Sequence, residues 1–217
     1  MGLDITVLAA DWGRLERTPA AEREGLLYEA GCPESDFGPA TEPEAGWVFP
    51  ASPKVPWSGR YEFRGTLGSY KPHFWAADGW DRAREFAEPA LREPLDGFLV
   101  GLIWWGADED SADDGDNGAD EADGADEPEA GLFPSDPEPW RPHRTLVRPP
   151  PAVTALAAHW ARADALLEGL RETYDLHASR PEGWIADFDA FDALVRQWAE
   201  VVDETARRGW GLLGLPV

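Results

Sequence analysis

Residues 153–205 read VTALAAHWARADALLEGLRETYDLHASRPEGWIADFDAFDALVRQWAEVVDET, the most regular hydrophobic pattern of the chain. Apolar side chains recur there in steps of three and four, the spacing of helices that pack along one seam. The pattern forms two series: Val153, Leu156, Trp160, Ala163, Leu167, Leu170, Tyr174, then Trp184, Phe188, Phe191, Val195, Trp198, Val202, Thr205.

A short link separates the two predicted helices. Ser179-Arg180-Pro181-Glu182 matches a capping box at the start of the second helix. Gly209 suits the left-handed residue that ends it. Two long helices joined by a short link pack side by side in opposite directions, so this stretch predicts an antiparallel helical hairpin.

The N-terminal half combines strand and helix patterns. Alternating apolar residues predict strands at 2–10 and 60–67, with a shorter one at 46–49. Helical spacing predicts helices at 18–31, 78–88 and 89–105, started by Thr18 with Pro19 and by Asp78, and kinked at Pro94. A strand at 97–105 is the alternative for the last piece.

A hairpin of two helices cannot bury its seam alone, so the two halves should share one core. The predicted fold is α+β and predominantly helical, with a small N-terminal sheet of two to four strands packed on helices and covered by the C-terminal hairpin. One domain is expected over residues 1–217.

Residues 107–130 interrupt this domain with twelve acidic residues, no basic residue and no large apolar side chain. Such a segment has no apolar surface to offset the entropy of ordering, so we expect a disordered acidic insert between 1–106 and 131–217. It supplies about half of the net charge of −23. That charge disfavours nucleic acids and anionic membranes as partners, and favours a basic protein or simple solubility.

Other features bear on compartment and class. Cys32 is the one cysteine, so a disulfide within the chain is impossible and a reducing, cytoplasmic compartment is expected. No apolar run is long enough to span a membrane, and the opening residues lack the basic start of a signal peptide. Two Lys against seventeen Arg suggest a high-GC bacterial source.

The opening GLDITVLAADW, the Trp-rich middle and the hairpin pattern resemble small uncharacterised proteins of high-GC actinomycetes. The resemblance covers no catalytic motif, and it implies no activity.

The densest group of functional side chains is expected in a loop between the second strand and a helix. One interpretation is a ligand pocket with aromatic walls, His73 as acid, base or ligand, and Lys71 for an anion. The other is a loop whose aromatic residues plug the core. The candidate ligand-binding residues are Tyr70, Lys71, His73, Trp75, Asp78 and Trp80.

A second candidate is an anion site at Arg141 and Arg144, whose guanidinium groups could hold a carboxylate or phosphate. Neutralisation of the acidic insert just upstream explains the same residues more simply. The four His residues lack metal-ligand spacing, and no GxSxG, GxGxxG or Walker motif occurs, so no metal, cofactor or catalytic residue is predicted.

Two hypotheses remain at this point. The first is a non-enzymatic acidic protein that binds a basic protein partner, in the manner of an immunity or antitoxin protein. The alternative is an enzyme or small-molecule binder with a pocket around Tyr70–Asp81. The absence of a catalytic motif favours the first; the sequence decides neither the partner nor the oligomeric state.

Overall fold

The computed structural model describes residues 5–32, 45–66, 69–102, 132–133, 135–136, 140 and 146–216. The expected acidic insert at 107–130 and the candidate anion site at Arg141 and Arg144 lie outside these residues. Within them the fold is α+β and predominantly helical, as predicted.

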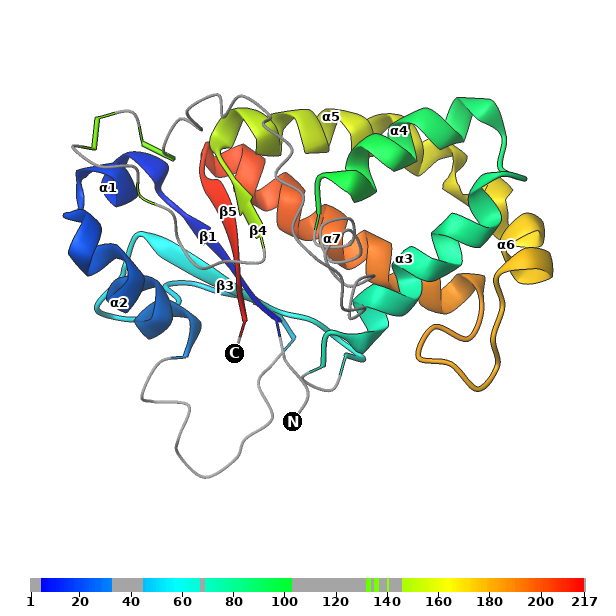
Figure 1. Cartoon of the computed structure of the whole chain (residues 1–217), viewed down its shortest axis with the longest axis horizontal. Coiled ribbons are helices and arrows are strands. Elements are labelled where there is room, and N and C mark those ends of the chain that lie inside the picture. The colour runs from blue at the N-terminus through cyan, green and yellow to red at the C-terminus, as the bar shows by residue number, and fades with distance from the viewer. Residues whose placement is uncertain are drawn as a thin grey trace, which may run out of the picture.

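An antiparallel sheet forms the middle of the molecule (Figure 1). Its described strands are β1 (Ile5–Ala10), β2 (Gly46–Val48), β3 (Ser58–Glu62), β4 (Leu146–Arg148) and β5 (Gly211–Pro216), in the order β2-β3-β1-β5-β4. The sequence predicted strands in the places of β1 and β2, and a strand at 60–67 that overlaps β3 only at residues 60–62. It predicted none in the places of β4 and β5, so the sheet has five strands instead of the expected two to four. Because β5 pairs with β1 along its whole length, both halves of the chain build one sheet.

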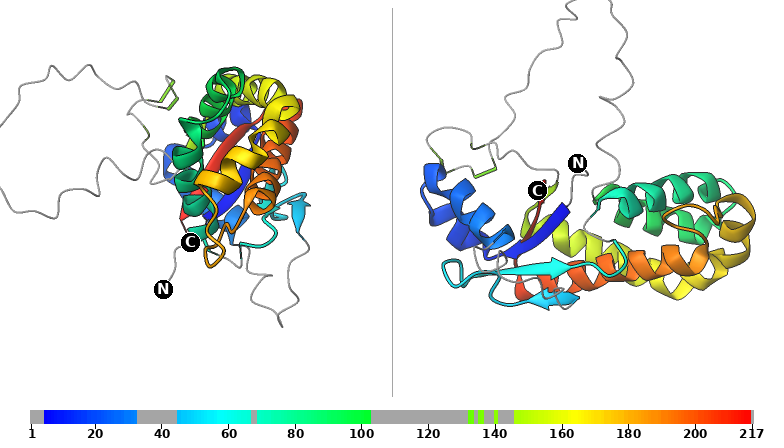
Figure 2. Two further views of the ribbon diagram at one scale, coloured as in Figure 1. Left: turned by 90° about the vertical axis from the view of Figure 1, so that its right-hand side faces the viewer. Right: turned by 90° about the horizontal axis from the view of Figure 1, so that it is seen from below.

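The helices lie in two layers on either side of this sheet (Figure 2). The smaller layer comprises α1 (Trp12–Arg17) and α2 (Ala20–Gly31). The larger comprises α3 (Lys71–Arg84), α4 (Pro89–Val100), α5 (Pro150–Leu167), α6 (Arg171–His177) and α7 (Phe188–Arg208), with a 3₁₀ turn at Glu168–Leu170.

Strand alternation explains the two cores. Successive side chains of a strand point to opposite faces, so Leu212 enters the core beneath α3–α7 while Leu213 enters the core beneath α1 and α2. Val7 and Leu8 divide in the same way on the neighbouring strand. Burial on both faces makes β1 and β5 the most enclosed strands of the sheet.

The predicted hairpin is present, with α5 and α7 antiparallel (Figure 1), but its first helix is divided at Glu168–Leu170 into α5 and α6. Every residue of the two predicted series is buried except Trp184, which precedes α7. Gly209 ends α7 with φ +66°, as predicted.

The starts of three helices differ from the sequence-based expectation. Asp187, rather than the Ser179–Glu182 box, caps α7 by accepting a hydrogen bond from Ala190 N at 3.0 Å. Thr18 ends α1, and its hydroxyl donates to the Arg14 carbonyl, so it does not start α2. The third difference is α3, which starts at Lys71, so Asp78 lies inside the helix.

Candidate functional site

The segment expected as a functional loop is the first half of α3. Pro72 at the second helical position fits this start, because the amide it lacks has no partner in a first turn. Helical spacing then separates the six candidate residues. His73 and Trp80 face the core, whereas Tyr70 and Lys71 face outward, with Trp75 half-buried.

His73 is enclosed by aromatic rings. Its Nδ1 accepts a hydrogen bond from Trp198 Nε1 at 3.0 Å, and its ring centroid lies 4.8 Å from that of Phe63. Burial disfavours the charged imidazolium and lowers the pKa of His73 to about 3. A neutral imidazole in this position serves packing and accepts one hydrogen bond.

Two more of the candidate residues, Trp80 and Asp78, are engaged in structural contacts. The buried indole of Trp80 donates to Asp96 at 3.0 Å, and Asp96 also accepts two hydrogen bonds from Arg84. Asp78 pairs with Arg82 at 2.9 Å and with Arg180 at 3.2 Å. The structure therefore does not unite His73 with Asp78, and the outward residues Tyr70, Lys71 and Trp75 form a surface instead.

A shallow, open groove of about 430 Å³ lies along α7, beside Trp160 of α5. Among the described residues, three carboxylates, two guanidinium groups and one indole line it: Glu200, Asp203, Glu204, Arg196, Arg207 and Trp160, with Ala199. Both guanidinium groups are already paired, Arg196 with Asp164 at 2.7 Å and Arg207 with Glu204 at 2.7 Å.

The carboxylates of the groove differ in their partners. Glu204 accepts hydrogen bonds from Arg207 and Arg208, which lower its pKa to about 2. Glu200 accepts from the Tyr61 hydroxyl at 2.8 Å. Asp203 is exposed and forms no ion pair with any described residue, and its partial desolvation together with the negative charge of Asp164 raises its pKa.

An aromatic rim adjoins the groove on the side of β2 and β3. The Arg208 guanidinium lies 3.8 Å from the centroid of Phe49 and 4.9 Å from that of Trp210. Trp47 stacks on Phe49 at 4.9 Å between ring centroids. Because Arg208 also bonds Glu204, the rim and the groove form one acidic and aromatic face, here called the groove face.

Sequence reasoning missed the groove face. Residues 196, 200, 203 and 207 also repeat in steps of three and four, with 204 beside them, but such a polar stripe is usual on a solvated helix face. Asp203 differs from the rest of this stripe because it has no ion-pair partner among the described residues and lies near Asp164. The sequence pattern does not show this, because Asp164 comes close only when α5 packs on α7.

Metal and membrane features are missing from the described residues. They contain no group of three or more His, Cys, Asp or Glu side chains that could hold a metal ion. None of the helices among them is long and apolar enough to cross a membrane. Cys32 follows α2 and is half-buried.

Compared with known proteins, the chain matches no protein-family model, no curated protein and no solved structure. Its function must therefore be argued from its own geometry.

Proposed function

We propose that this is a non-enzymatic protein that binds a basic protein partner through the groove face, in the manner of an immunity or antitoxin protein. The observation that supports the proposal best is the Asp203 carboxylate in the groove, which has no ion-pair partner among the described residues. A Lys or Arg side chain of the partner would supply the missing cation.

The electrostatics of the groove favour such a cation. Taking together Asp164, Asp192, Glu200, Asp203 and Glu204 against Arg196, Arg207 and Arg208, negative charges are in excess. A cation beside Asp203 would offset the repulsion from the neighbouring carboxylate of Asp164. The buried indole of Trp160 forms part of the lining, with the Arg196 guanidinium 5.8 Å from its ring centroid.

The rim adds the apolar part of a binding surface. Phe49 is exposed, and Trp47 and Trp210 are half-buried, so their rings can contact a partner without a large rearrangement. Aromatic anchors beside charged groups are the usual composition of binding hot spots. The net charge of −23 would speed the encounter with a basic protein, and the single cysteine favours a reducing, cytoplasmic setting.

The alternative, an enzyme or small-molecule binder around Tyr70–Asp81, has less support. A general acid or base must reach its substrate and exchange a proton near the working pH. His73 is buried among aromatic rings with a pKa of about 3, which argues against that role.

Co-purification from the source cells tests the proposal. The wild-type chain should retain a protein of high isoelectric point in a fixed ratio, and Asp203→Asn combined with Glu200→Gln should lose it. Glu172→Gln, at an exposed position on α6, is the matched control and should retain it. Retention that is independent of the groove variants, or the absence of any such partner, would contradict the proposal.

A further inference from the structure

We infer a second interaction surface at the N-terminal end of α3. It binds an acidic segment of a protein partner, in which a carboxylate lies next to an apolar side chain. This aromatic end comprises Tyr70, Lys71, Phe74 and Trp75 of the α3 start with Arg180 and Trp184 of the segment between α6 and α7. The inference does not depend on the groove face.

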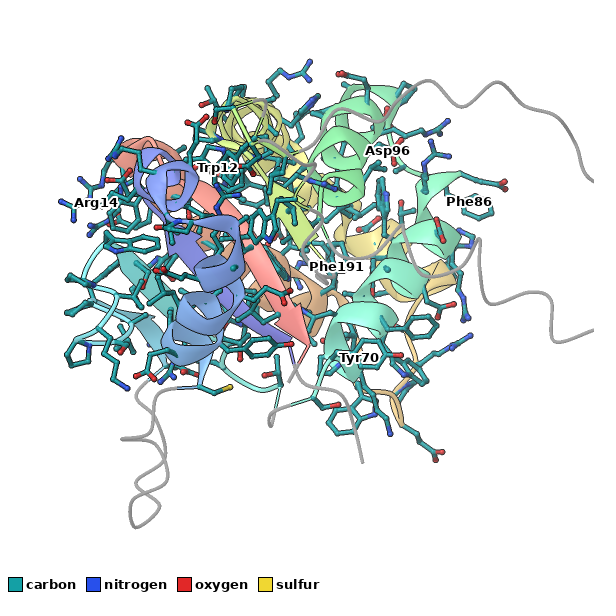
Figure 3. The ribbon with its side chains drawn as sticks, turned by 60° about the vertical axis from the view of Figure 1, so that its left-hand side comes forward. Trp12, Arg14, Tyr70, Phe86, Asp96 and Phe191 are labelled. Carbon is teal, nitrogen blue, oxygen red and sulfur yellow. The ribbon has the colours of Figure 1, made fainter. Side chains whose placement is uncertain are left out.

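The aromatic end exposes several large rings together. Tyr70 is 37% exposed, Phe74 45% and Trp184 41%. Figure 3 shows Tyr70 projecting from the start of α3, away from the core. Single exposed apolar residues are common on soluble proteins, but a group drawn from two segments marks an interaction surface.

The two segments are held tightly against each other. A Cβ on Gly183 would lie 2.6 Å from the Trp75 ring, so only glycine permits this approach. The Arg180 guanidinium lies 5.1 Å from the Trp75 centroid and pairs with Asp78. The surface is thus formed before any partner arrives, which limits the entropy lost on binding.

Lys71 gives the aromatic end its chemical preference. Its ammonium lies 5.9 Å from the Trp184 centroid and forms no ion pair with a described residue, whereas Lys54, the other lysine of the chain, pairs with Glu29 at 3.0 Å. Lys71 is also the first residue of α3, whose first turn contains no acidic residue. A cation at the positive end of a helix dipole is unfavourable, and a carboxylate of a partner would offset that cost.

The neighbouring charges point the same way. Asp78 divides its carboxylate between Arg82 and Arg180, so it does not fully neutralise both guanidinium groups. Glu182 is exposed in the same segment, so Lys71, Arg82 and Arg180 outnumber Asp78 and Glu182 by one positive charge. In a chain with 42 acidic residues, this local excess selects an acidic segment. Single-stranded nucleic acid also binds to basic and aromatic side chains, but the net charge of −23 disfavours a nucleic-acid partner.

The test uses the full chain and a defined probe. The capped peptide acetyl-Glu-Trp-Glu-Leu-amide is titrated to about 5 mM, the range of weak surface contacts, and amide and indole NMR shifts are followed. We expect shifts at Lys71, Phe74 and the Trp184 indole. Lys71→Gln should weaken binding about fivefold, the value of one favourable ion pair. Lys54→Gln and the groove variant Asp203→Asn should bind as wild type does.

Three results would overturn the inference. The first is equal binding of the peptide with glutamine in place of glutamate, and the second is an unchanged affinity in Lys71→Gln. The third is a stronger response of the same resonances to a thymidine oligonucleotide, which would make the aromatic end a nucleic-acid surface. None of these results bears on the groove face, since Asp203 is not part of the aromatic end.

Discussion

The indole of Trp198 and the imidazole of His73 form a polar pair inside an apolar core. Trp198 is fully buried, and His73 supplies the acceptor for its one N–H group. A buried donor without a partner costs about 1–3 kcal/mol. The pair therefore explains both the burial of a histidine and its lowered pKa without any catalytic role.

We predict that Trp198→Ala lowers the free energy of unfolding by about 3–5 kcal/mol, because it leaves a large cavity. Trp47→Ala, at a half-buried position of β2, should cost less. Urea denaturation of both variants checks this. Equal losses would show that the seam of α7 is not the centre of the core.

His73 also predicts a pH dependence. Its pKa is about 3 in the folded protein and about 6.5 in an unfolded chain, so between these values the unfolded state binds more protons. The contribution of neutral His73 to the free energy of unfolding is therefore full above about pH 6.5, and it is lost as the pH falls toward 3. From this residue we expect a loss of about 2 kcal/mol between pH 7 and pH 5. Imidazole NMR signals should show that His73 does not titrate above about pH 4. A His73 midpoint near 6 would contradict this reading.

The pH dependence of stability that we expect from Asp203 has the opposite sign to that from His73. Because its pKa is raised, the folded state binds more protons than the unfolded state, so this carboxylate weakens the fold as the pH rises through that pKa. We predict that Asp203→Asn melts at the same temperature as wild type or higher at pH 7, with no gain at acidic pH. Thermal unfolding at both pH values measures it. A marked loss of stability would mean that Asp203 has a structural partner rather than a binding role.

At the scale of elements, helix starts depended on tertiary contacts that periodicity does not report. The Ser179–Glu182 pattern fits a capping box, but the chain at this point turns past Trp75 and Asp78 instead of coiling. The helix begins only at Phe188, where Asp187 has extended backbone and an acceptor in reach of Ala190 N.

We predict that Asp187→Ala costs about 1 kcal/mol, the usual value of a helix cap. Ser179→Ala should cost less, because its hydroxyl bonds the Asp175 side chain rather than a helix amide. Chemical denaturation of the two variants separates the alternatives. A larger loss in Ser179→Ala would favour the capping box.

The whole molecule depends on a strand that the sequence pattern did not reveal. β5 lies between β1 and β4, and its Leu212, Leu213 and Leu215 are fully buried in the two cores. Its run GLLGLP lacks the alternation of a half-buried strand because both faces are covered.

We predict that removing residues 211–217 prevents folding, since it splits the sheet and opens both cores. Circular dichroism and thermal unfolding would show low helicity or no cooperative transition. A truncated chain that melts cooperatively near the wild-type temperature would show that the helices α3–α7 fold without β5.

At the scale of the whole molecule, the acidic side chains are unevenly distributed along the chain. The described residues contain 24 of the 42 acidic side chains and 17 of the 19 basic ones, so the folded surface is only mildly acidic. The long-range attraction for a basic partner therefore depends mainly on the remaining acidic residues. The specific contacts with that partner depend on the groove face.

The sequence by itself determined the helical hairpin, the strands β1 to β3, the end of α7 at Gly209 and the mixed α+β class. These follow from hydrophobic period and glycine geometry, which act between residues close in the chain. Only the tertiary structure decided the places of β4 and β5, the burial of His73 and the proximity of Asp164 to Asp203. Those depend on which residues lie opposite each other across α3, α5, α7 and the sheet, and on the desolvation and charge that this proximity creates.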